Sequence, residues 1–198
     1  MTIKNLGARI ETVWEGLRPM TRKMIERALQ EASGKLLPTP STKFAYDTQS
    51  DWELSRLLTA LDEQLVDPSH NSDPAKLKEL DQMADACFAL LEDGTGSAEA
   101  FIQLADRTLK RADFAKFDKL SNILAERFSA GEIAEIIRQE PLPQIRAVAY
   151  ETLAMMQPIV LVNLLDDPLY ESIAQNALEK QVFEFGNEEA RMILDNVF

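Results

Sequence analysis

Two stretches in the C-terminal third of the chain share one pattern: PQIRAVAYETL at residues 143–153 and PLYESIAQNAL at residues 168–178. They align without gaps at an offset of 25, which matches Ala149 with Ala174 and Leu153 with Leu178. Each begins with proline, which suits the first position of a helix, and each carries its apolar residues at helical spacing. Self-similarity of this kind indicates that one helical unit is used more than once.

A fainter copy of the same pattern, AKFDKLSNILA, occupies residues 115–125. It puts Phe117 at the place of Ile145 and Ser121 at the place of Ala149. A small residue at the same place in every copy allows neighbouring helices to approach closely. The three copies therefore predict stacked helices.

These stretches resemble HEAT-like helical repeats, whose phrase is an apolar pair, an acidic turn often with proline, an apolar residue, an arginine, and alanines at helical spacing. Residues 164–168, LLDDP, supply the apolar pair and turn, and Arg146 supplies the arginine. Asp118 and Glu171 replace that arginine in the other copies, and the spacing is short for the family. The resemblance covers residues 113–198 and implies a right-handed α-α superhelix; an ordinary irregular helical bundle is the alternative.

The rest of the chain is also helical in pattern, with proline and glycine confined to short gaps, so the sequence predicts an all-α protein without strands. We expect about eleven helices, with well over half of the residues helical. Six have both ends predicted, namely 3–16, 19–33, 130–139, 143–156, 158–165 and 187–197; others begin at Ser50, Asp73, Ser97 and Asp167, and one follows the apolar stripe from Phe114 to Phe128.

Three helix starts have recognisable caps. Ser50 with Glu53, and Ser129 with Glu132, have the spacing of a capping box, in which the two side chains bond reciprocally to backbone N–H groups. Asp73 is followed by Pro74, a cap followed by a first-turn proline.

The helices fall into three regions in the sequence. We expect an N-terminal helical hairpin at 1–34, a helical region at 50–112 packed on the repeats, and the HEAT-like repeats at 113–198, together forming one continuous domain. Residues 35–49 are the longest connection without periodicity and are expected to be cut first in limited proteolysis. Within them, residues 43–46, KFAY, are predicted to fold back over the helices, with a partner-binding loop as the alternative.

Charge is segregated along the 198 residues, whose net charge is -12. Residues 1–35 carry +3, residues 36–99 carry -9 and residues 142–198 carry -6. An acidic surface repels phosphate backbones, so we expect no nucleic-acid partner. The basic stretch at 18–27 is predicted to be a solvated face paired with the acidic middle of the chain; a membrane-surface or partner-binding helix is the alternative.

No stretch reaches the ~20 apolar residues of a membrane span, and the first residues lack the apolar core of a secretory signal. We therefore expect no membrane partner and a cytoplasmic location.

The residues that usually build catalytic or metal sites are scarce. His70 and Cys87 are the one histidine and the one cysteine, which is too few for a zinc site. His70 is predicted to be a turn residue and Cys87 an inert thiol on an apolar helix face. The stretch from Asp93 to Leu104 lacks the glycine and glutamate of a calcium loop, and no phosphate-binding glycine motif occurs. We therefore expect no metal, no cofactor and no catalytic residues.

The resemblance to HEAT-like repeats implies a non-enzymatic protein that binds another protein along its stacked helices, as an interaction or adaptor module. One alternative is an acidic helical enzyme that uses only carboxylates and hydroxyls. Another is an acidic binder of a basic protein that mimics nucleic acid.

In HEAT-like arrays the second helix of each pair lines the inner face, here the helices at 130–139, 158–165 and 187–197. Their polar side chains are the candidate partner-binding residues: Glu135, Arg138, Asn163, Arg191 and Asp195. A plain solvated surface is the alternative. Asn163, the one polar side chain of its helix, must either reach solvent or find a hydrogen-bond partner inside the stack.

Overall fold

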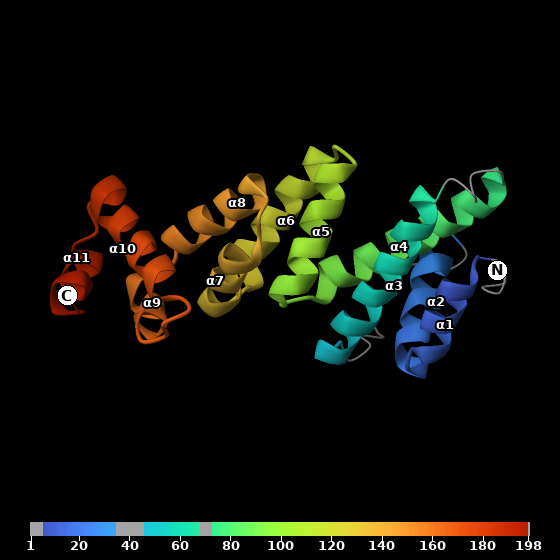
Figure 1. The fold of residues 1–198 in the computed structure, drawn as a ribbon, viewed down its shortest axis with the longest axis horizontal. Helices are drawn as coiled ribbons and strands as arrows, with labels where there is room; N and C mark the ends of the chain where they lie inside the picture. The colour runs from blue at the N-terminus through green and yellow to red at the C-terminus, as the bar shows by residue number, and fades with distance from the viewer. Residues whose placement is uncertain (1–5, 35–45, 68–72, 198) are drawn as a thin grey trace. The chain divides into compact units, whose positions relative to one another are not determined.

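The computed structural model describes residues 6–34, 46–67 and 73–197, which form eleven helices and, within these ranges, no strand (Figure 1). The predicted all-α class and the predicted majority of helical residues are thus confirmed. Three sequence interpretations concern residues outside the described ranges: residues 3–5 of the first helix, residues 35–45 of the long connection, and His70.

The helices belong to two compact units, Met1–Thr95 and Gly96–Phe198. We call them the N-terminal and C-terminal units. The division lies inside the region predicted at 50–112, because the helix Ala98–Lys110 packs against helices that follow it. The predicted packing of residues 50–112 on the repeats stays a prediction.

The N-terminal unit is a four-helix assembly. Helices α3 and α4 pack along each other, while α1 contacts α3 and α2 contacts both α3 and α4. Four leucines of α3 recur at helical spacing and are fully buried, which supplies much of the apolar core: Leu54, Leu57, Leu58 and Leu61. The helices are α1 (Ala8–Gly16), α2 (Pro19–Ala32), α3 (Thr48–Val66) and α4 (Pro74–Gly94).

The C-terminal unit contains seven shorter helices, which pack in alternation. Helix α7 contacts α5 and α9, and α9 also contacts α11; likewise α8 contacts both α6 and α10. Two rows of helices result, one of α5, α7, α9 and α11 and the other of α6, α8 and α10. The helices are α5 (Ala98–Lys110), α6 (Phe114–Arg127), α7 (Ala130–Gln139), α8 (Pro143–Ala154), α9 (Pro158–Leu165), α10 (Glu171–Phe185) and α11 (Glu188–Val197).

The aligned residues of the sequence repeat are core residues of α8 and α10. Ala149 and Ala174 are both fully buried, as are Leu153 and Leu178. Helices α8 and α10 contact each other, so the small residues lie where two neighbouring helices need a close approach.

The capping box predicted at Ser50 is wrong. Helix α3 begins at Thr48 with Asp47 as its cap, and the Ser50 N–H donates to the Asp47 carboxylate at 2.8 Å. Glu53 instead accepts hydrogen bonds from Arg18 and Thr21 of another part of the unit. A nonlocal cation competes for this carboxylate more strongly than a backbone N–H does.

The capping box predicted at Ser129 is half right. The Ser129 hydroxyl accepts the Glu132 N–H at 3.2 Å, as expected. The Glu132 carboxylate, however, accepts the Ala98 N–H at 2.7 Å, and thereby satisfies a free donor in the first turn of α5. The packing of α7 on α5 makes this exchange possible.

Other helix ends lie close to their predicted positions. The Asp73 carboxylate caps α4 ahead of Pro74, and the Ser97 hydroxyl caps α5, as predicted. Helix α10 begins at Glu171 rather than at Asp167, because the Asp167 carboxylate accepts the Leu169 N–H and stabilises a turn instead. Helix α8 ends at Ala154 rather than at residue 156.

Candidate functional site

Glu135 and Arg138, two of the predicted partner-binding residues, bind each other on α7. The Arg138 guanidinium donates to both Glu135 carboxylate oxygens, each at 2.6 Å, and the Tyr170 hydroxyl donates to the same carboxylate at 2.9 Å. The hydrogen bonds from Arg138, and secondarily those from Gln139 and Tyr170, lower the pKa of Glu135 to about 2 despite its partial burial. This carboxylate therefore ties α7 to the start of α10.

The other predicted residues are exposed on the same row of helices. Asn163, the one polar side chain of α9, is exposed to solvent and therefore needs no hydrogen-bond partner between the helices. On α11, Arg191 pairs with Glu188 at 3.1 Å, and Asp195 is exposed. Helix α9 contacts both α7 and α11, so the structure places the three helices next to one another. Partner binding by these side chains stays a prediction.

Large apolar side chains are exposed in the second half of the C-terminal unit, a feature the sequence analysis missed. Phe183 is 83% exposed and Met155 is 72% exposed. On a sequence, such residues look like core positions of an apolar helix face, and their exposure follows only from the packing. The set comprises Met155, Ile159, Val160, Leu169, Phe183, Phe185 and Met192.

One hydrogen bond holds together the two segments that carry four of these side chains. The Gln181 side-chain amide donates to the Met156 carbonyl at 2.8 Å, which holds the last turns of α10 beside the turn between α8 and α9. The four lie within four residues of this bonded pair along the chain. We call them the apolar group: Met155, Ile159, Phe183 and Phe185.

The surroundings of the apolar group are acidic. Lys180 pairs with Glu151, and also with Glu184 at 3.7 Å, so its charge is compensated. Residues 142–198 hold three basic and nine acidic side chains in all. An apolar surface inside a negative field favours a ligand that carries both apolar and basic side chains.

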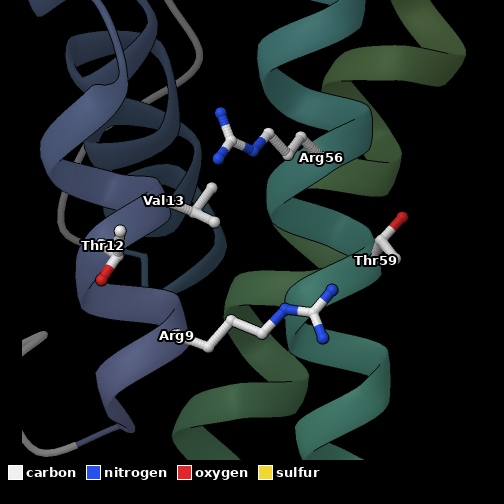
Figure 2. Close-up of a pocket in the computed structure, with 5 residues that line it drawn as sticks. All are labelled: Arg9, Thr12, Val13, Arg56 and Thr59. Atoms are coloured by element: carbon white, nitrogen blue, oxygen red, sulfur yellow. The ribbon is translucent and has the colours of Figure 1, made fainter.

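A separate pocket of about 320 Å³ lies between α1 and α3 of the N-terminal unit (Figure 2). In Figure 2, the Arg9 side chain extends from α1 toward α3, and the Arg56 side chain extends from α3 toward α1. Val13 contributes a buried apolar wall, and Thr12 and Thr59 complete the lining. No local pattern could reveal this pocket, because packing of α1 on α3 brings together residues that are distant in sequence.

Arg18, the first basic residue of the stretch at 18–27, binds two acidic residues. Arg18 donates to both oxygens of Asp47, at 2.9 and 2.7 Å, and its backbone N–H and Nε donate to Glu53 at 3.1 and 3.2 Å. For Arg18, the predicted pairing with the acidic middle of the chain is confirmed. Farther along the stretch, Arg22 donates to the Glu15 carbonyl at 2.6 Å and Arg27 pairs with Glu31 at 2.8 Å.

Cys87 is fully buried on α4, as predicted. Among the described residues, no group of three or more histidine, cysteine, aspartate or glutamate side chains is arranged to hold a metal ion. Within the same ranges, no single helix is both long and apolar enough to cross a membrane; α8 and α9 meet that test only as a pair, and the chain bends by 114° between them.

No family model matches the chain, and neither a curated protein nor a solved structure does. The surfaces of the two units are therefore the basis for assigning a function.

Proposed function

We propose that this chain is a non-enzymatic protein-binding module whose C-terminal unit holds a segment of its partner at the apolar group. The observation that carries the proposal is the exposure of four large apolar side chains on two segments that the Gln181–Met156 hydrogen bond joins, from 52% for Phe185 to 83% for Phe183. Scattered apolar residues are normal on a surface, but a cluster of them is typical of a protein interface.

The charge of the C-terminal unit selects the kind of partner. In residues 142–198, which include the apolar group, acidic side chains outnumber basic ones, and Lys180 is already paired with Glu151 and Glu184. A partner segment with apolar side chains flanked by lysine or arginine gains both apolar burial and long-range attraction. A partner of this kind fits both an adaptor module and an acidic binder of a basic protein.

We further propose that α5–α11 stack as a HEAT-like superhelix. The alternating contacts of the two rows, and the buried alanines shared by α8 and α10, support this arrangement. In a superhelix of this kind, α7, α9 and α11 form one continuous face. Asn163, Arg191 and Asp195 then lie beside the apolar group and add polar contacts to the same partner.

The test is affinity capture from the native host, followed by binding measurements with the captured partner. Wild-type protein is compared with the double variant Phe183→Ser, Phe185→Ser. We expect affinity to fall about tenfold or more, while the melting temperature stays nearly constant because both side chains are already exposed. Binding should also weaken with added salt.

Phe114→Ser is the matched control, since Phe114 is 65% exposed on α6 of the same unit but lies far from the apolar group in sequence. Equal affinity of the wild type and the double variant would refute the apolar group as the binding site. Turnover of hydrolase or transferase substrates by the purified chain would refute the non-enzymatic assignment.

A further inference from the structure

We propose that the pocket between α1 and α3 binds the oxyanion of a small ligand, a carboxylate or a phosphate group, with Arg56 as the principal binding residue. This inference concerns the N-terminal unit and does not depend on the function proposed for the C-terminal unit. It rests on the lining of the pocket shown in Figure 2.

Arg56 is the decisive residue because its charge is uncompensated. Its guanidinium lies 5.2 Å from the centre of the Trp52 ring, and it forms no ion pair with any residue in the described ranges. Stacking on Trp52 restricts the guanidinium, so less conformational entropy is lost when it binds an anion.

Arg9 adds a second guanidinium from the opposite side of the pocket. It pairs with Glu63, whose carboxylate is about half exposed, so part of its charge is neutralised. Two guanidinium groups and one carboxylate leave the pocket with a net positive charge. A planar guanidinium donates two parallel hydrogen bonds to a carboxylate or phosphate, which favours these anions over a spherical ion such as chloride.

The threonines of the pocket direct the anion to the arginines. The Thr12 hydroxyl donates to the Ala8 carbonyl at 2.9 Å, and the Thr59 hydroxyl donates to the Ser55 carbonyl at 3.0 Å. Their protons are therefore engaged within their own helices, so these hydroxyls donate no hydrogen bond to an anion. The volume of about 320 Å³ admits more than a single oxyanion, so the ligand is an organic molecule that carries one.

The experiment is an NMR titration of the ¹⁵N-labelled 198-residue chain with sodium phosphate and, separately, with succinate, at constant ionic strength. We expect saturable shifts of the Arg56 and Arg9 Nε–H signals, with a Kd of about 1 mM or lower for at least one anion. Saturation by phosphate alone identifies a phosphoryl ligand, and saturation by succinate alone identifies a carboxylate. Saturation by neither anion overturns the proposal.

The variants give a graded series. Arg56→Gln should weaken binding about tenfold, and Arg56→Lys, which keeps the charge but loses the planar pair of donors, about threefold. Glu63→Gln should strengthen binding about twofold, because it releases Arg9 from its ion pair.

Arg146→Gln is the control, since Arg146 is exposed on α8 in the other unit. If it weakens binding as much as Arg56→Gln does, the anion responds to net charge alone and the pocket assignment is wrong. The same conclusion follows if Arg56→Gln stays folded, as shown by circular dichroism, and keeps wild-type affinity.

Discussion

Two helix junctions, one in each unit of the molecule, differ in the groups that are buried at the contact. In the N-terminal unit, directed polar contacts from Arg18, between α1 and α2, reach Asp47 and the buried Glu53 at the start of α3. In the C-terminal unit, α8 and α10 meet through buried alanines and leucines. Polar contacts with defined donors specify one geometry, whereas small apolar faces can be repeated by further helices.

This difference also explains where apolar surface remains. Glu53 is buried, which by itself raises its pKa, yet hydrogen bonds from Thr21 and Arg18 outweigh that effect and hold the pKa below its ordinary value. The carboxylate is thus charged, and its acceptor oxygens are occupied. The stack proposed for α5–α11 would have no such closure, because each helix that buries one apolar face presents another to the next. The exposed apolar group lies among the last helices of the chain.

The strongest test of the comparison is Glu53→Ala. It removes the acceptor of Arg18 and of the buried Thr21 hydroxyl, so we expect the free energy of unfolding to fall by about 3 kcal/mol. Urea denaturation at neutral pH measures it. Glu63→Ala, which removes a carboxylate on the exposed side of the same helix, should cost less than about 1 kcal/mol. Similar losses in the two variants would contradict the role assigned to the polar contacts.

The corresponding test in the C-terminal unit is Ala174→Leu. Added methylene and methyl groups have no space between α8 and α10, so we expect a loss of about 1–3 kcal/mol in the free energy of unfolding. Ala147→Leu makes the same chemical change at an exposed position of α8 and should be nearly neutral. Tolerance of leucine at residue 174 would show that the stack is loosely packed there.

A pair of glycine substitutions compares the space left in the two units. A Cβ atom at Gly94, in the N-terminal unit, would overlap the Tyr46 ring, whereas at Gly131, in α7, it meets nothing closer than the Ser129 hydroxyl oxygen at 3.9 Å. We expect Gly94→Ala to lower the melting temperature by an amount equivalent to about 1–2 kcal/mol. Gly131→Ala should raise the stability by about 0.5 kcal/mol through helix propensity. The opposite order would disprove the tight fit of Tyr46.

The smallest effect concerns Glu135, the polar tie of the C-terminal unit. Its pKa of about 2 lies below its ordinary value of 4.5, so its stabilising contribution is present above pH 4.5 and is lost as the pH falls toward 2. Glu135→Gln should therefore lower the stability by about 0.5 kcal/mol at neutral pH. The difference from wild type should shrink as the pH falls through that range. Urea denaturation in a pH series measures it, and a difference that does not vary with pH would contradict the assignment.

Local sequence patterns predicted most of the helices, because apolar spacing, prolines and caps all act within a few residues. They failed where a distant group competed for a side chain. Ser50 and Glu53 have the spacing of a capping box, but Glu53 accepts a hydrogen bond from Arg18, which lies in the connection between α1 and α2. Helix α3 also starts earlier than predicted, because Asp47, an equally good cap, precedes Ser50 by three residues.

The candidate sites were less predictable than the fold. Helix α9 contacts both α7 and α11, but whether the three helices form an inner face stays a prediction. Arg138 donates to Glu135, which also accepts a hydrogen bond from Tyr170, and partner binding by Arg138 stays a prediction. The pocket at Arg9 and Arg56 depends on the tertiary packing of α1 on α3, which helical periodicity does not predict.

The contact between Glu132 and Ala98 has a consequence for the order of folding. The first turn of α5 receives one of its hydrogen-bond acceptors from a residue 34 positions later, on α7. Nucleating a helix costs free energy, and a first turn whose hydrogen-bond acceptor lies on another helix is less stable when it forms alone. We therefore expect α5 and α7 to open and close together in hydrogen exchange, although α6 lies between them in the sequence.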